Sequence, residues 1–246
     1  MYLGDNARSP YGTRSFEVVY RFTKQAVETL FNEGCQLVIL ACNTASAKAL
    51  RTIQQRDLPQ WDPARRVLGV IRPTVELMDK ISKSKHVGIL GTTGTITSDS
   101  YSLEIKKMFP HMTVTGEACP MWVPLVENNE FDSPGADYFV RKHLEHILAA
   151  DPEIDTLVLG CTHYPLLKKM IGDFMGGDVH LVDSGKVTAQ AAAAALDDLG
   201  LLNGKTSGGT AKYFVSDTPD NFDELAHTFL GEYAGGTVER IAIETY

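Results

Sequence analysis

The chain has 246 residues, of which 43% are hydrophobic and 22% charged, so it can bury one large core or two medium α/β domains without disulfides or a structural metal. Its formal net charge of −8 argues against a general phosphate-binding surface, and we expect no nucleic-acid partner. The apolar runs are too short to span a membrane, and no basic segment followed by an apolar stretch opens the chain, so we expect neither a membrane partner nor export.

The elements follow a regular order along the chain. Apolar residues recur at helical spacing from Phe16 to Leu30, and Gly34 follows as a helix stop. Short continuous apolar runs, typical of strands buried on both faces, lie at 37–40, 67–71, 87–90, 157–159, 180–182 and 213–215. Stretches compatible with helices separate them. This alternation predicts an α/β fold with mostly parallel sheets and helices on both faces.

One sequence pattern occurs twice, once in each half of the chain. Residues 36–45 read QLVILACNTA and residues 155–164 read DTLVLGCTHY. Each copy has a buried strand, a small residue, a cysteine and then polar residues that open a helix. The repeat indicates two similar halves that face each other.

The two cysteines of this pattern, Cys42 and Cys161, stand where chemistry is favoured. Ligands gather at the carboxyl ends of parallel strands, and a helix that starts there points free N–H groups at the site. Such a position stabilises a thiolate, so we expect both thiol pKa values to move toward neutral. Asn43, Thr44 and Thr162 suit helix caps and equally suit ligands for a carboxylate or an ammonium group.

Several chemical interpretations stay open at this point. Two matched thiols favour two bases that approach one carbon from opposite faces, as racemisation of an amino acid requires. Cys161 with His163 also fits a cysteine nucleophile with its base. Buried cysteines commonly serve packing alone, and we expect that of Cys35 and Cys119.

The cysteine and histidine spacings bear on metal sites and on the compartment. The four cysteines include no CxxC pair, which argues against a disulfide framework or structural zinc and favours a reducing cytoplasm. His143 and His146 are three residues apart on a predicted helix, but no third ligand is evident. We expect both on the surface and no metal site.

At these residues the chain resembles the bacterial glutamate racemases. The matching segments are GDNARSPYGT at 4–13, ACNTAS at 41–46, GVIRP at 69–73, GTTGTITSDSY at 91–101, ACPMWVPLVE at 118–127, GCTHYPLL at 160–167 and VDS at 182–184. They run in order through nearly the whole chain. Aspartate and hydantoin racemases share the two-cysteine plan, but the GCTHYP and PYG segments favour glutamate.

The resemblance implies two doubly wound α/β domains, residues 1–66 plus 183–246 and residues 67–182, with the active site in the cleft between them. It implies interconversion of L- and D-glutamate without pyridoxal phosphate, a metal or any other cofactor. The D-glutamate would supply peptidoglycan synthesis in the cytoplasm. The oligomeric state stays open, with a homodimer as the expected assembly.

The resemblance also implies roles for single residues. Cys42 would take the α-proton of D-glutamate and Cys161 that of L-glutamate, with His163 and Glu127 assisting Cys161. The substrate site would be lined by Pro10, Tyr11, Gly12, Asn43, Thr44 and Thr162.

The chain departs from the family pattern at its start. Family members usually place a strand and an Asp-Ser-Gly loop ahead of the segment that begins here at Met1. That piece provides a central strand and an acid beside the first cysteine. Without it the first sheet would have unpaired backbone groups and Cys42 would lack its acid, and three explanations stay open: a misassigned start, a truncated product, or a sheet that reorganises or pairs with another chain. A non-catalytic protein that binds glutamate, or a regulatory one, stays open as the alternative, as does a related racemase.

Overall fold

The computed structural model describes residues 1–204, 209–219, 222, 226, 229 and 237–243, and every strand pairing among them is parallel. The strands are β1 (Tyr2–Gly4), β2 (Leu37–Leu40), β3 (Arg66–Gly69), β4 (His86–Gly91), β5 (Thr113–Ala118), β6 (Thr156–Gly160), β7 (His180–Asp183), β8 (Tyr213–Val215) and β9 (Val238–Arg240). The helices are α1 (Phe16–Asn32), α2 (Asn43–Lys48), α3 (Leu50–Thr52), η1 (Ile53–Asp57), α4 (Leu58–Trp61), α5 (Ile71–Val75), α6 (Met78–Ile81), α7 (Thr93–Thr97), α8 (Ser100–Met108), α9 (Trp122–Glu127), α10 (Pro134–Ala150), η2 (Tyr164–Leu167), α11 (Lys168–Met175) and α12 (Gly185–Asp198).

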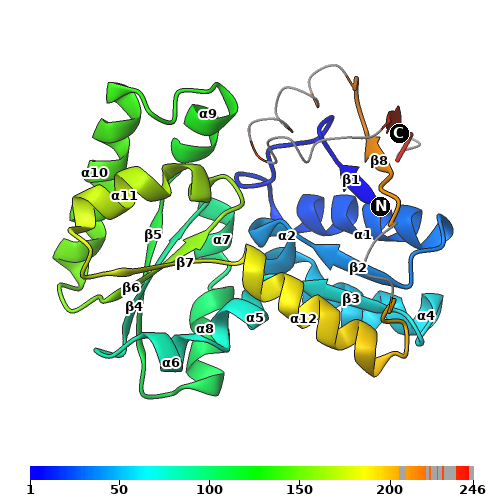
Figure 1. Cartoon of the computed structure of the whole chain (residues 1–246), viewed down its shortest axis with the longest axis horizontal. Coiled ribbons are helices and arrows are strands. Elements are labelled where there is room, and N and C mark those ends of the chain that lie inside the picture. The colour runs from blue at the N-terminus through cyan, green and yellow to red at the C-terminus, as the bar shows by residue number, and fades with distance from the viewer. Residues whose placement is uncertain (205–208, 220–221, 223–225, 227–228, 230–236, 244–246) are drawn as a thin grey trace.

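Two lobes lie side by side (Figure 1). The second lobe is built on a four-stranded sheet of order β5-β4-β6-β7, and the first lobe holds the remaining strands. In the part of the chain that the structure describes, no helix is both long and apolar enough to cross a membrane. The predicted fold class, α/β with two doubly wound lobes, is confirmed. The residue boundaries predicted for the two domains stay a prediction.

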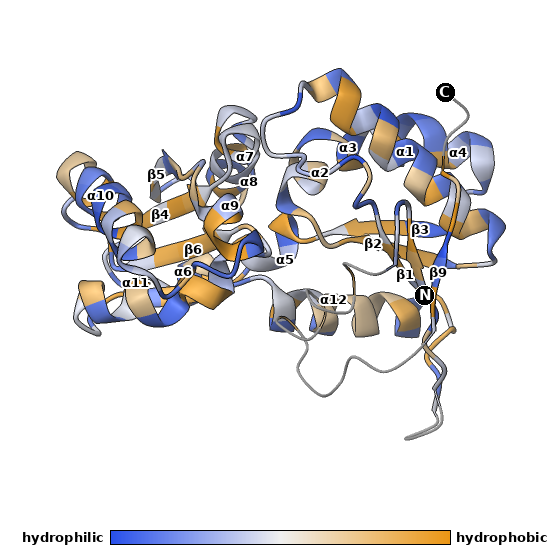
Figure 2. Cartoon of the chain, turned by 90° about the horizontal axis from the view of Figure 1, so that it is seen from above, coloured by the Kyte–Doolittle hydropathy of each residue, from blue (hydrophilic) through white to orange (hydrophobic). Residues whose placement is uncertain are grey.

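The second-lobe sheet is covered on both faces. Leu157 and Leu159 of β6 point into a core shared with α9, α10 and α11, whereas Val158 between them joins a core with α5, α6 and α8. Figure 1 shows these two helix groups on opposite sides of the sheet. A strand buried in this way carries apolar residues at every position, which explains its continuous apolar run. Figure 2 shows β4 and β6 in the hydrophobic colour between helices of mixed colour.

The first-lobe sheet is in two pieces. β2 pairs with β3, while β1, β8 and β9 form a separate ladder of order β1-β8-β9. Among the described residues no ladder joins β1 to β2. Val38 and Leu40 are buried against α1, but Ile39 between them is 39% exposed. One face of β2 is therefore only partly covered.

Candidate active site

A cavity of ≈ 260 Å³ lies where strands of both lobes end. Its lining comes from the residues that follow β2, β3 and β6, from the end of β7 and from the start of α12: Ala41, Val70, Cys161, Thr162, Pro165, Asp183, Ser184, Gly185 and Thr188. Parallel sheets place ligands at the carboxyl ends of their strands. The cavity therefore occupies the position that the topology favours for a site.

Cys42 stands next to this cavity, directly after Ala41. It is the N-terminal cap of α2, and its Sγ accepts a hydrogen bond from the Ala45 amide at 3.5 Å. None of its hydrogen-bond partners in the described part of the chain is a carboxylate. Within the described residues, the first cysteine thus has a helix start for support and no carboxylate bonded to it.

Cys161 has a different environment. Its Sγ lies 3.7 Å from Nδ1 of His163, and Nε2 of that ring lies 3.1 Å from Oε1 of Glu127, the last residue of α9. A neutral imidazole with its proton on Nε2 satisfies both contacts, since Nδ1 accepts from the thiol and Nε2–H donates to the carboxylate. Thr162 Oγ1 lies 3.3 Å from the same Nδ1. The structure thus brings Cys161, Thr162, His163 and Glu127 together.

The thiol pKa values contradict the expectation from the sequence. Burial raises the pKa of Cys161 from its ordinary 9.0 to about 12, although N–H and hydroxyl donors of His163 and Thr162 lower it. Burial also raises the pKa of Cys42. The predicted move toward neutral is wrong here because removing water from the thiolates outweighs the few N–H donors at the helix starts. A negative charge on Cys42 raises the pKa of Cys161 further, so the two thiols lie within electrostatic range.

Asn43 offers an unused donor beside Cys42. Its side chain is 2% exposed, and its Oδ1 accepts from the Tyr101 hydroxyl at 2.6 Å. Its Nδ2 is buried and has no hydrogen-bond partner in the described part of the chain. A buried donor without an acceptor is costly, so this amide suits a ligand oxygen. Thr44 is engaged differently, because its Oγ1 lies 2.9 Å from that of Thr92 in the second lobe.

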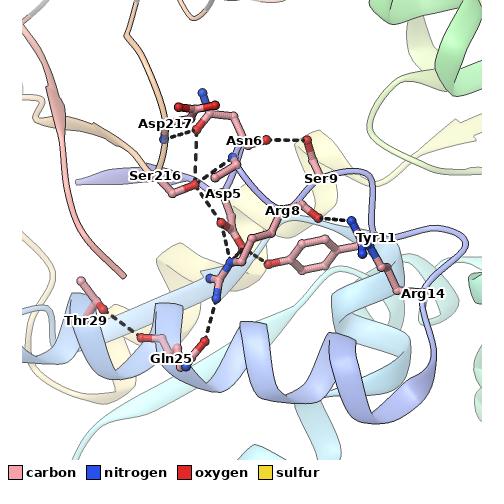
Figure 3. Close-up of polar contacts among 11 residues, drawn as sticks. Asp5, Asn6, Arg8, Ser9, Tyr11, Arg14, Gln25, Thr29, Ser216 and Asp217 are labelled. Carbon is pink, nitrogen blue, oxygen red and sulfur yellow. Dashed lines mark hydrogen bonds and ion pairs between the residues drawn. The ribbon is translucent and has the colours of Figure 1, made fainter. Parts of the chain in front are cut away.

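The loop that contains Pro10, Tyr11 and Gly12 reaches the second lobe. The carbonyl of Gly12 accepts from the Gly94 amide of α7 at 2.7 Å. A Cβ on Gly12 would lie 2.9 Å from Cβ of Thr92, so this approach requires glycine. The Tyr11 hydroxyl donates to Asp5 in the polar cluster of Figure 3.

Some residues at the cavity were not singled out from the sequence. Four of them lie at the end of β7 and the start of α12: Asp183, Ser184, Gly185 and Thr188. The VDS segment at 182–184 indicates this neighbourhood but assigns no role to these residues. Only their position could have identified them, because they come directly after the predicted strand 180–182.

The two histidines of α10 share one carboxylate partner in the structure. His143 and His146 contact the two carboxylate oxygens of Glu117 at 2.6 Å and 2.8 Å. The surface prediction holds for His146, whose side chain is 74% exposed, but is wrong for His143 at 12%, because Trp122 packs against its ring. The described residues contain no group of three or more His, Cys, Asp or Glu side chains placed to hold a metal ion.

Comparisons with known proteins agree on one family. Residues 1–192 match the Asp/Glu/Hydantoin racemase family. The chain is 41% identical to a glutamate racemase of Geobacter metallireducens over 99% of this chain and 87% of that protein, and 39% identical to one of Levilactobacillus brevis over 94% and 82%.

Solved structures give the same result. The glutamate racemase isoform RacE1 of Bacillus anthracis superposes with a TM-score of 0.89 at 33% identity, covering 98% of this chain and 86% of that one. The glutamate racemase of Francisella tularensis, solved in complex with D-glutamate, gives 0.88 at 30% identity over 100% and 88%. The chain therefore belongs to the Asp/Glu/hydantoin racemase family, among its glutamate racemases.

Proposed function

We propose that this racemase interconverts L- and D-glutamate without a cofactor, with Cys42 and Cys161 as acid and base on opposite faces of the α-carbon. The observation that carries the proposal is the series Cys161–His163–Glu127, in which Cys161 lines a cavity together with Ala41, the neighbour of Cys42. Relatives support the substrate: the Francisella tularensis structure is a complex with D-glutamate, and the Escherichia coli one, 25% identical, is a complex with L-glutamate and an activator.

We infer a proton path at Cys161 from these contacts. Because its thiol is protonated at neutral pH, a base must first take that proton. Nδ1 of His163 is placed to accept it, and the Glu127 carboxylate stabilises the resulting imidazolium through Nε2–H. The Cys161 thiolate then removes the α-proton of L-glutamate, and the Cys42 thiol delivers its proton to the other face.

The reverse direction uses the same groups. Cys42, which the forward step leaves as a thiolate, removes the α-proton of D-glutamate, and Cys161 delivers its own proton to the other face and regains one from the His163 imidazolium. Hydrogen bonds to the substrate carboxylate must stabilise the carbanion-like transition state, since an α-proton beside an ammonium group is weakly acidic. Asn43 Nδ2, the hydroxyls of Thr44 and Thr162 and the amides of the Pro10–Gly12 loop are the donors that we assign to this task.

The proposal extends to the setting of the reaction. We infer that the D-glutamate supplies peptidoglycan synthesis and that the reaction takes place in the cytoplasm. The homodimer stays a prediction.

Circular dichroism of L- and D-glutamate solutions tests the chemistry. Wild-type protein should racemise both enantiomers, while Cys42→Ala and Cys161→Ala should each lower turnover by at least about 10²-fold. Cys35→Ala is a matched control, because this half-buried cysteine lies 3.6 Å from the Met1 sulfur in the first lobe and outside the cavity lining. Full activity in either active-site variant would sink the two-thiol mechanism.

One observation favours a second candidate, a protein that binds glutamate without converting it. Among the described residues, Cys42 has no carboxylate or imidazole as a hydrogen-bond partner to take its proton, in contrast to Cys161 beside His163. Calorimetric binding of glutamate together with an absence of α-proton exchange would establish that reading. Preferential turnover of aspartate would instead indicate a related racemase.

A further inference from the structure

A buried carboxylate organises the loop that carries Tyr11. The side chain of Asp5, directly after β1, is 11% exposed and accepts hydrogen bonds on both oxygens (Figure 3). Nε of Arg8 contacts Oδ1 at 2.9 Å and Oδ2 at 2.8 Å. Oδ1 also accepts from the Ser216 hydroxyl at 2.8 Å, and Oδ2 accepts from the Tyr11 hydroxyl.

The partners of Asp5 come from separate parts of the first lobe. Arg8 is 5% exposed, donates to Gln25 of α1 at 2.6 Å and stacks its guanidinium 4.3 Å from the Phe22 ring centroid. Ser216 follows β8, and its Oγ accepts from the Ala7 amide at 3.0 Å. The carboxylate thus joins the end of β1, α1, the end of β8 and the Tyr11 loop. A charged group buried in this way is strongly constrained in position.

Beyond Tyr11 the same loop is held by both lobes. The Gly12 carbonyl accepts from Gly94 of the second lobe at 2.7 Å, and the Arg14 carbonyl accepts from Lys48 Nζ of α2 at 2.7 Å. The backbone between these two carbonyls has little freedom once the Tyr11 side chain is fixed. The loop that Asp5 contacts through Tyr11 lies within electrostatic range of Cys42 and is bonded to α2 through Lys48.

We infer that Asp5 is a positioning residue: its carboxylate holds the Tyr11 hydroxyl and so fixes the Pro10–Gly12 loop in the conformation that binds the substrate. This inference rests on the proposed function, because it takes the loop as part of the glutamate site. Asp5 does not contact the reacting atoms. It acts through Tyr11.

A double-mutant cycle tests the route through Tyr11. Asp5→Asn keeps the shape of the side chain but loses its charge and one acceptor, and Tyr11→Phe removes only the hydroxyl. Each single variant should raise KM for L-glutamate by about 10-fold and change kcat much less, and the double variant should be no worse than the more impaired single variant. Effects on KM that multiply in the double variant would overturn the inference.

Asp57→Asn is the matched control. Asp57 is 4% exposed and accepts from the Tyr20 hydroxyl at 2.8 Å and from Lys24 Nζ at 3.0 Å, so it has the same chemistry in the same lobe without a contact to the loop. It should lower thermal stability and leave KM within about twofold of wild type. An equal rise in KM for Asp57→Asn and Asp5→Asn would show that general destabilisation is responsible.

Hydrogen–deuterium exchange gives a readout that does not depend on turnover. Asp5→Asn and Tyr11→Phe should speed exchange in the peptide that spans residues 9–15, where the Arg14 amide donates to the Tyr11 carbonyl at 3.0 Å. Unchanged exchange in both variants would refute the positioning role. This conclusion would hold whether or not the wild-type protein racemises glutamate. Absence of turnover in the wild type would by itself count only against the proposed function.

Discussion

At alkaline pH the free energy of unfolding of Cys161→Ser should fall less steeply with rising pH than that of the wild type. The folded chain raises the pKa of this thiol from 9.0 to about 12, so above pH 9 the folded state keeps a proton that the unfolded state releases. Stability therefore falls as pH rises through the window between the two values. Serine does not ionise there, so the variant lacks this contribution.

The size of the effect follows from the two pKa values. At pH 8 the thiol is protonated in both states and contributes almost nothing. At pH 10 the unfolded thiol is one pH unit above its pKa, which costs the wild type about 1.4 kcal/mol relative to pH 8. From pH 8 to pH 10, the free energy of unfolding of the wild type minus that of Cys161→Ser should therefore fall by about 1.4 kcal/mol.

Urea denaturation followed by tryptophan fluorescence at pH 8 and pH 10 measures the difference. Ile147→Val is a non-ionising comparison in the same core, where the side chain is 1% exposed. It should cost about 0.5–1.5 kcal/mol at both pH values. A Cys161→Ser difference that stays constant between pH 8 and pH 10 would refute the reasoning that burial keeps this thiol protonated.

Three further predictions concern single contacts. Tyr164→Phe removes the 3.0 Å hydrogen bond to the Cys119 carbonyl and should lower the free energy of unfolding by about 1–3 kcal/mol in urea titrations; an unchanged midpoint would contradict it. Gly160→Ala places a Cβ 2.7 Å from the Leu90 carbonyl oxygen and should cost about 1–3 kcal/mol in the same assay, so wild-type stability would count against the tight β4–β6 spacing. His163→Asn should lower kcat for L-glutamate by about 10²-fold in circular-dichroism assays while thermal stability stays close to wild type, and an unchanged kcat would remove this residue from the mechanism.

Several strands could be predicted from their continuous apolar runs. β2 and β8 coincide with the predicted runs 37–40 and 213–215, and β6 extends the predicted run 157–159 by one residue at each end. β6 is buried on both faces and is therefore apolar throughout, whereas the equally apolar run of β2 leaves Ile39 39% exposed, so such a run predicts the strand but not the burial of both its faces.

Other strands gave no such signal. β5 reads TVTGEA and lies at the edge of its sheet, so polar residues are tolerated there. β1 has only three residues and pairs with β8 far along the chain. Their pairing depends on contacts between distant segments, which a local pattern does not contain.

The candidate site divides in the same way. Cys161 and His163 are two residues apart, and their contact could be expected from local spacing. Glu127 lies 36 residues from His163, and only the resemblance to the family suggested it. The thiol pKa values could not be predicted, because they depend on how much water the folded site excludes.

The most direct test of the two-thiol mechanism is exchange of the α-proton with deuterated water, followed by proton NMR for each enantiomer separately. Cys161→Ala should exchange the α-proton of D-glutamate only, and Cys42→Ala that of L-glutamate only, in both cases without inversion. Exchange of both enantiomers with inversion by either variant would contradict the assignment of one thiol to each face.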